Sequence, residues 1–291
     1  MKILRASGFS LVELIMVIVI TGILAASVTV FLKPAIDSFV DTRRRADLTD
    51  IADTALRRMG QDIRSAVPNS VRSAGDQCFE LLPTSSGGRY RAGPDTAWDV
   101  ANPGSPSAYI DTSALTGGFD VLSPLSMPLP PVNGDWVVID NQNTDDAYNK
   151  TNMAALTVGA SPDTSVGLTR ITFAVKKQFP VGYDGGRFVV VPDNAGKQAV
   201  AYVCDSSGVD AQGNGTGTLY RVTLAIAPTF STCPAIAGSA IVATNVRQCT
   251  FVYNPNQGAT QQSGFVWMRL ELSRSKESVA LAYGVHVDNV P

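Results

Sequence analysis

The apolar positions of this 291-residue chain follow three patterns in succession. Residues 9–32 form an almost unbroken apolar run, residues 35–67 place apolar side chains about 3.6 positions apart, and the chain beyond Pro68 alternates apolar and polar positions in short stretches. The first two patterns indicate helix and the third indicates strands. We therefore predict an α+β fold, in which a long, bent N-terminal helix packs on a C-terminal antiparallel, β-rich globular domain.

The run at 9–32 is long and apolar enough to cross a membrane. It has 24 residues with one charge, at Glu13, and the nineteen residues after Glu13 carry none. A helix of this length extends about 36 Å, and the hydrocarbon core of a bilayer is about 30 Å thick. A buried core helix is the alternative, but such helices rarely contain so long an apolar run. We expect residues 9–32 to be a membrane-inserted helix.

Residues 33–68 are expected to continue this helix with an amphipathic half. Pro34 should kink or loosen the helix because it lacks an N–H for the helical hydrogen bonds, and Pro68 should end it. Opposite charges lie four positions apart, so the run 43–45 is expected to be a solvated, locally paired helix face rather than a binding patch. The expected pairs are Asp41–Arg45, Arg43–Asp47, Asp53–Arg57 and Arg58–Asp62.

Residues 69–291 carry the strand pattern. The alternation is most regular in 265–273 and 278–288, and it places His286 on the face of its strand opposite the apolar side chains. A surface or interface position is expected for this histidine. The candidate strands are 78–82, 135–140, 168–175, 187–191, 198–204, 218–226, 248–254, 265–273 and 278–288.

The stretch 84–134 interrupts this pattern. Between Pro83 and Gly134, 15 of 52 residues are glycine or proline, too many for regular elements. We expect a long irregular excursion of the β-rich domain rather than a linker between two domains. Excursions of this kind often carry partner contacts.

Composition narrows the function classes. The chain is 45% apolar and 16% charged with a formal net charge of −2, which excludes a disordered chain and offers no basic stripe for nucleic acid. The single histidine, His286, excludes most metal sites and histidine-dependent catalytic arrangements. We expect no enzymatic activity, no cofactor and no metal.

Two loops have oxygen-bearing side chains at alternate positions, a pattern that calcium-binding loops share. They are Asn141, Asn143 and Asp145 in one loop and Asp210, Gln212 and Asn214 in the other. The twelfth positions hold Asn152 and Arg221 instead of the acidic residue that an EF-hand loop uses. Asparagine- and glycine-rich turns explain both loops more simply.

The four cysteines favour disulfides. None lies in a CxxC pair, which supports an oxidising compartment over a zinc site. Four cysteines allow three pairings. Cys204 ends a predicted strand and Cys233 lies in the next long loop, so the sequence favours Cys204–Cys233 together with Cys78–Cys249.

A short basic leader precedes the apolar run. Residues 1–8 include Lys2 and Arg5 but no acid, a start that is also typical of a cleaved secretory signal. The carboxylate of Glu13 has no use in such a signal. At a helix centre it costs roughly 2.5–3.5 kcal/mol on insertion scales, so Glu13 needs a partner. The nearest candidate is the α-amine that cleavage after Gly8 would free at Phe9.

The charges on either side of the run give conflicting indications of topology. Lys33 and the run 43–45 outnumber Lys2 and Arg5, which by count alone would place the C-terminal part in the cytoplasm. The free amino terminus adds positive charge to the leader side, and the four cysteines suit the periplasm. We expect the C-terminal domain to be exported.

The start of the chain resembles the type IV prepilin family. The residues that carry the resemblance are Gly8, Phe9, Ser10, Leu11, Val12, Glu13 and Leu14. It implies a pilin-like fold and a leader, residues 1–8, that a prepilin peptidase removes between Gly8 and Phe9 before Phe9 is N-methylated. Glu13 would then neutralise the Phe9 amine of a neighbouring subunit during assembly. Pairing makes two charges that are each costly in lipid tolerable, and it fixes the axial register between subunits.

Two further stretches, 43–72 and 217–291, resemble minor pilins of the MSHA pilus, of the MshO type, and more loosely PilW-type minor pilins and GspJ-type pseudopilins. Major pilins are usually much shorter than this chain. The resemblance implies a single-pass inner-membrane protein with a periplasmic domain that primes or caps a pilus. Its expected partners are other major and minor pilins and the prepilin peptidase. The alternatives are a type II secretion pseudopilin and a pilus-tip adhesin that binds through 84–134; an anchored hydrolase has the least support.

Overall fold

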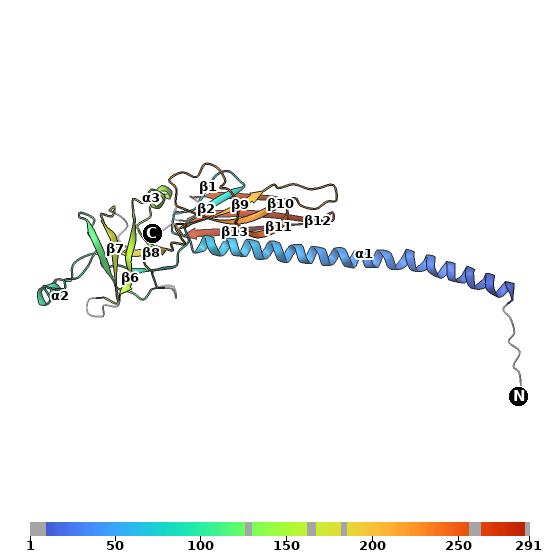
Figure 1. Cartoon of the computed structure of the whole chain (residues 1–291), viewed down its shortest axis with the longest axis horizontal. Coiled ribbons are helices and arrows are strands. Elements are labelled where there is room, and N and C mark those ends of the chain that lie inside the picture. The colour runs from blue at the N-terminus through green and yellow to red at the C-terminus, as the bar shows by residue number, and fades with distance from the viewer. Residues whose placement is uncertain (1–9, 126–129, 162–166, 182–184, 256–262, 289–291) are drawn as a thin grey trace, which may run out of the picture.

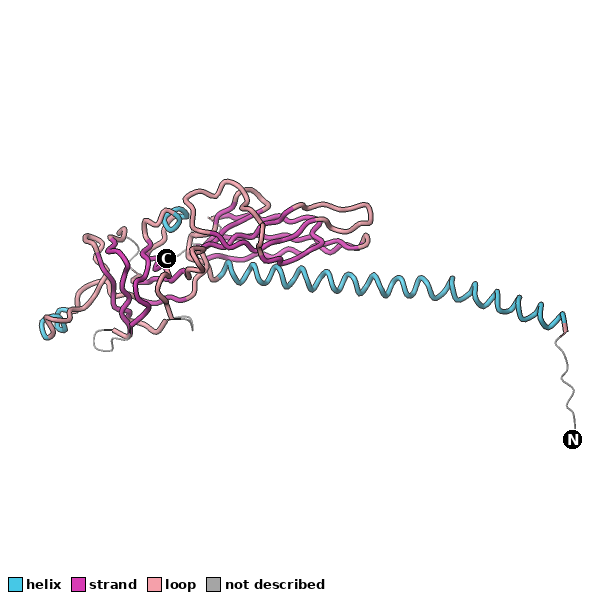
Figure 2. Tube along the Cα trace, in the orientation of Figure 1, coloured by secondary structure: helices cyan, strands magenta, loops and turns pink. Residues whose placement is uncertain are grey.

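The structure, a computed structural model, describes residues 10–125, 130–161, 167–181, 185–255 and 263–288. A single long helix projects from a head made of two β-sheets (Figures 1 and 2). The N-terminal end of the helix and the second sheet lie at opposite ends of the molecule (Figure 1). The predicted α+β fold, with an apolar N-terminal helix and an antiparallel β-rich domain, is confirmed.

Helix α1 runs unbroken from Leu11 to Arg64. It joins the predicted membrane half to the predicted amphipathic half, and it ends before Pro68 and Asn69, whose φ is 60°. The helix continues through Pro34, and Figure 1 shows a gentle curve rather than a sharp break. A proline removes one hydrogen bond and tilts the helix locally, which a helix of this length accommodates as curvature.

The first sheet has seven antiparallel strands. Its strands are β1 (Arg72–Ser73), β2 (Cys78–Leu81), β9 (Ala199–Asp205), β10 (Gly217–Leu224), β11 (Ala240–Asn254), β12 (Ser263–Arg274) and β13 (Glu277–Asp288), in the order β1-β2-β9-β10-β11-β12-β13. The last three are long strands that follow one another along the chain as neighbours. They form the surface on which α1 lies (Figure 1).

The C-terminal third of α1 packs on one face of this sheet. Its buried residues recur every three or four positions, as an amphipathic helix requires, and the first of them is Leu48. They are Leu48, Ala52, Ala55, Leu56, Met59, Gly60 and Ile63. On the sheet they meet alternate residues of β12, Val266, Met268 and Leu270, which are fully buried. Each large apolar side chain buried in this way contributes roughly 1.5–3 kcal/mol.

Charged residues of α1 pair with the sheet more than with one another. Arg45 is bonded to Glu277, Asp47 to Arg274 at 3.2 Å, and Asp62 to Arg221 at 2.8 Å. Of the four predicted pairs along the helix, only Asp53–Arg57 is confirmed, at 2.6 Å. The predictions for Asp41–Arg45, Arg43–Asp47 and Arg58–Asp62 are wrong because strand and hairpin residues offer partners that helical spacing cannot reveal; Asp41 pairs with Arg44 instead.

The second sheet is an insertion between β2 and β9. It has six antiparallel strands, in the order β3-β8-β5-β6-β7-β4, and two short helices accompany it. The strands are β3 (Ser86–Arg89), β4 (Thr116–Val121), β5 (Trp136–Ile139), β6 (Met153–Ser161), β7 (Thr169–Lys177) and β8 (Arg187–Val191), and the helices are α2 (Thr96–Ala101) and α3 (Thr144–Tyr148). Leu81 pairs with Val200 in the first sheet, so the chain leaves and re-enters that sheet at one place.

The prediction that 84–134 lacks regular elements is wrong, because the stretch supplies β3, β4 and α2. Four of its glycines lie in the sheet, two in β3 and two in β4. At a β-bulge in β4, a Cβ on Gly118 would lie 2.3 Å from the carbonyl oxygen of Ile171 in β7, so only glycine allows the two strands to approach. The sequence pattern also did not predict β1 and β6. All nine strands that it did predict are present.

The disulfides are Cys78–Cys233 and Cys204–Cys249, with Cα–Cα separations of 5.7 and 6.4 Å. The favoured pairing of Cys204 with Cys233 and Cys78 with Cys249 is therefore wrong. Successive strand residues point to opposite faces. Cys78 lies opposite Val203, on the face covered by the loop that contains Cys233. Cys204, the residue after Val203, points to the face covered by α1, as does Cys249.

Gly60 of α1 lies against Tyr283 of β13, so a substitution at Gly60 tests how closely the helix packs on the sheet. A Cβ on Gly60 would lie 2.6 Å from Cε1 of Tyr283. We expect Gly60→Val to lower the free energy of unfolding by about 1–3 kcal/mol, because the added methyl groups overpack this contact. The measurement is chemical denaturation of detergent-solubilised protein. Thr54→Val, at an exposed position of the same helix, is the control and should change stability by less than about 0.5 kcal/mol. Equal stability of the two variants would contradict this packing.

The disulfide pairing predicts a second result. Peptide mapping without reductant should recover a peptide pair joined by Cys78 and Cys233. Removing both cysteines, Cys78→Ser with Cys233→Ser, should lower stability by about 2–4 kcal/mol, because the loop 225–239 is then tied to β2 by packing alone. Recovery of a peptide pair that joins Cys204 to Cys233 would show that the pairing is wrong.

Candidate assembly site

The first turn of α1 is closed by a reciprocal capping box. The backbone N–H of Glu13 donates to Oγ of Ser10 at 3.2 Å, and Oε2 of Glu13 accepts from the backbone N–H of Ser10 at 3.0 Å and from its hydroxyl at 3.1 Å. Serine at the N-cap with glutamate three positions later is the sequence signature of this arrangement, so the sequence could have revealed it. The carboxylate of Glu13 is thereby held at the N-terminal end of the helix, beside the backbone nitrogen of Ser10.

The arm behind this cap has no buried residue from Leu11 to Asp47 in the described structure. Its large apolar side chains are exposed to solvent: Leu11 is 75% exposed, Phe31 78% and Phe39 68%. A contiguous apolar surface of this size marks an interaction with lipid or protein. The helix meets the length and composition required of a membrane span, and its most apolar window lies entirely outside the head.

The hydroxyl groups of the arm are compatible with an apolar environment. Thr21, Ser27 and Thr29 each donate to the carbonyl oxygen four residues earlier; for Ser27 the distance is 2.8 Å and for Thr29 it is 2.7 Å. Lipid offers no hydrogen-bond partner, so bonds within the helix are the way to satisfy such groups. Glu13 is left as the one ionisable residue of 11–32.

The other predicted site residues lie elsewhere. Gly8 and Phe9 fall outside the described residues. His286 is exposed on β13, on the face opposite Val285 and Val287 as predicted, and its ring lies 5.1 Å from that of Phe265.

The two loops considered for calcium use their oxygens internally. Asp210 accepts from the backbone N–H groups of Gln212 and Asn214 at 2.9 and 2.8 Å, and Asn141 accepts through Oδ1 from the backbone N–H of Ala147 at 3.0 Å. These bonds support the turn explanation. Within the described ranges, no group of three or more metal-ligating side chains is found.

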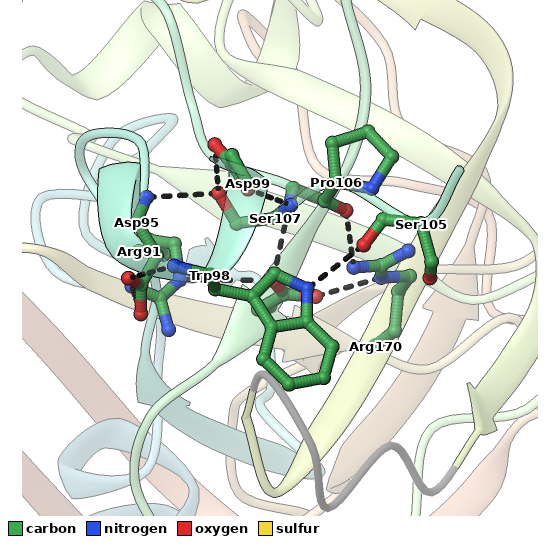
Figure 3. A network of polar contacts seen from close by, with 10 residues as sticks. Arg91, Asp95, Trp98, Asp99, Ser105, Pro106, Ser107 and Arg170 are labelled. Carbon is green, nitrogen blue, oxygen red and sulfur yellow. Dashed lines mark hydrogen bonds and ion pairs between the residues drawn. The ribbon is translucent and has the colours of Figure 1, made fainter. Parts of the chain in front are cut away.

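A polar network supports α2 at the end of the molecule farthest from the arm (Figures 1 and 3). Asp120 is 1% exposed and accepts from Nε of Arg170 at 2.7 Å and from the N–H of Ala108 at 2.9 Å. Asp99 accepts from the N–H and the hydroxyl of Ser107 at 2.6 and 3.0 Å. Acids and donors satisfy one another here, which is typical of structural support.

Comparison with known proteins bears on the start of the chain. Residues 3–29 match the prokaryotic N-terminal methylation motif. This match supports a type IV prepilin-like signal, as the residues around Gly8 and Glu13 indicated. No curated protein and no solved structure matches the chain.

A signal of this kind has direct consequences for the chain. It implies processing by a prepilin peptidase and assembly with pilins, and together with the apolar helix it indicates a membrane anchor. Prepilin-like proteins are, as a group, structural subunits.

The motif predicts where the mature chain begins. N-terminal sequencing or mass spectrometry of protein from the membrane fraction should find N-methylated Phe9 as the first residue. Gly8→Glu should block this cut and leave the leader attached, with Ala6→Glu, which adds the same charge two positions earlier, as a control. An intact Met1 in the unaltered protein, or a start near Val28 as a secretory signal would give, would contradict prepilin processing.

Proposed function

We propose that this chain is a minor pilin, cut between Gly8 and Phe9 and N-methylated at Phe9, that primes or caps a type IV pilus of the MSHA kind. One observation carries the proposal. An apolar arm without a buried residue, residues 11–47, begins inside the methylation motif matched at residues 3–29. Such a surface is stable in a bilayer before assembly and against the arms of other subunits after it.

The single charge of the arm supports assembly by pairing. The carboxylate of Glu13 lies at the start of the helix, where the amine of a mature Phe9 in a neighbouring subunit can approach it in a parallel bundle. Each charge alone is costly in an apolar environment, and pairing offsets that cost. The pair also fixes the axial register between subunits, because any axial shift separates the two charges.

The arm continues past the length that a bilayer covers. Ile36 and Phe39 are 56% and 68% exposed, although they follow the predicted span. Arms of neighbouring subunits would cover these side chains in a fibre. A simple membrane anchor would leave them in water, so their exposure favours a role in assembly over a role as an anchor alone.

The position of the second sheet supports a place at the end of a fibre. The six-stranded sheet and α2 lie beyond the C-terminal end of α1 (Figure 1). In an array of parallel, axially staggered helices, the head of the next subunit would lie in that direction. The inserted sheet takes up this space, which favours a capping position over a repeated position in the shaft.

The exported orientation and the choice of fibre are part of the proposal. The two disulfides suit a head in the periplasm. The alternatives are a GspJ-type pseudopilin of type II secretion and a tip adhesin.

Crosslinking in cells followed by co-purification distinguishes a secretion pseudopilin from a pilus subunit. MSHA-type pilins as neighbours would support our proposal, whereas secretion pseudopilins as neighbours would contradict it.

The pairing role of Glu13 gives a testable result. Glu13→Ala should insert at least as well as the unaltered protein, because it removes a charge from the span, but fibre numbers should fall about tenfold or more. The measurement is counting fibres by electron microscopy in a strain that carries only the variant. Ser27→Ala, a neutral change in the same arm, is the control and should leave fibre numbers unchanged. Normal fibre numbers with Glu13→Ala would contradict the pairing.

A further inference from the structure

A pocket of about 350 Å³ lies where the chain leaving α1 meets the second sheet. Val67 and Pro68 form one wall, and the strands β3, β5 and β8 form the other. A pocket of this size holds a small ligand. It is separate from the arm, so its role does not follow from assembly.

Two arginines on neighbouring strands define one side of the pocket. Arg89 of β3 and Arg187 of β8 are directly opposite each other in the ladder, so their side chains share a face, and both are exposed. Like charges at such positions repel and destabilise a sheet. In the part of the chain that the structure describes, neither guanidinium has an ion pair or a hydrogen bond, whereas other strand arginines, such as Arg72 and Arg221, pair with carboxylates. The guanidinium pair is therefore available to an anion.

Asp140 lines the same pocket directly after β5. It is 7% exposed, and among the described residues no side chain of opposite charge lies within 4.0 Å of its carboxylate. Burial raises the pKa of Asp140 to about 6, so it is mostly ionised at neutral pH. The next residue fixes its position: Asn141 donates through Nδ2 to the carbonyl oxygen of Pro68 at 2.6 Å.

The remaining lining adds one hydroxyl and an apolar surface. The hydroxyl oxygen of Ser123 accepts from the backbone N–H of Arg89 at 2.9 Å, so its own proton is free to donate. A Cβ on Gly88 would lie 3.0 Å from this oxygen, a tight contact that a larger residue would press on Ser123. Val138 and Val189, which pair across β5 and β8, provide the apolar floor.

We propose that this pocket binds a small ligand that carries one carboxylate and neighbouring hydroxyls, of the uronic-acid class. The guanidinium pair suits a carboxylate, because arginine forms charge-assisted, often bidentate bonds with it. Asp140 accepts from a ligand hydroxyl, Ser123 donates to a ring or hydroxyl oxygen, and the valines contact the C–H face of the ring. Asp140 would repel a phosphate or sulfate, because the negative charge of these anions extends over more oxygens. A simple carboxylate such as acetate has no hydroxyl group that could donate to Asp140.

Calorimetric titration of the full chain in neutral detergent near pH 7.5 tests this, with glucuronate as the probe and glucose, which lacks the carboxylate, as the matched ligand. Glucuronate should bind saturably in the millimolar range or tighter, and glucose should not. Arg187→Gln and Arg89→Gln should each weaken glucuronate binding about ten- to a hundredfold, the effect of losing a hydrogen bond to a charged group. Arg58→Gln, which removes the same charge from an exposed position of α1, should have no effect.

Asp140→Asn separates the hydroxyl contact from the charge contact. It should weaken glucuronate binding and strengthen phosphate binding, because repulsion is removed while the guanidinium pair remains. Thermal denaturation of each variant checks folding. Arg187→Lys keeps the positive charge but loses the planar guanidinium that can form two parallel hydrogen bonds, so this second variant is also expected to bind glucuronate weakly. Absence of saturable glucuronate binding, equal binding of glucose, or unchanged affinity in both arginine variants would overturn the proposal. Tighter binding of an acidic peptide than of glucuronate would also overturn it, in favour of a protein partner.

Discussion

The burial of one apolar stripe of α1 against the seven-stranded sheet supports the rest of the structure. The stripe begins at Leu48 and ends at Ile63, and it joins the N-terminal part of the chain to its last three strands. Residues 11–47 of the same helix have no buried side chain. One helix therefore meets two apolar environments: its own sheet near the C-terminal end, and lipid or other subunits along the arm. Ion pairs such as Asp62–Arg221 flank the stripe and fix the position of the helix on the sheet.

The second sheet depends on the first for its attachment. Because β2 and β9 are antiparallel neighbours, an insertion between them enters and leaves at one point and leaves their register intact. Arg72 fastens the junction: it bonds Glu80 at 2.8 Å and lies 3.4 Å above the ring of Tyr148 in α3. Burial raises the pKa of Glu80, and the neighbouring Arg72 opposes this shift. The pocket with Arg89 and Arg187 lies beside this junction.

The candidate assembly site at Glu13 is visible in the sequence, whereas the pocket is not. Glu13 is visible because a lone charge in an apolar run is costly and therefore conspicuous. Arg89, Asp140 and Arg187 are ordinary polar residues in sequence, far apart along the chain, and only strand pairing brings them together. The disulfides have the same explanation. The sequence favours pairing Cys204 with the nearest loop cysteine, but the alternation of faces in β9 turns Cys204 toward α1 and Cys249.

The sequence alone determined the long helix, its membrane-compatible half, the position of Glu13, the methylation motif and most strands. These features are local: each depends on hydrophobic periodicity or on residues within one or two turns of helix. The tertiary structure decided the inserted sheet, the disulfide pairing, the partners of Arg45, Asp47 and Asp62, and the pocket. Those depend on contacts between residues distant in the chain, whose pairing is set by which faces and strand ends meet when the core closes.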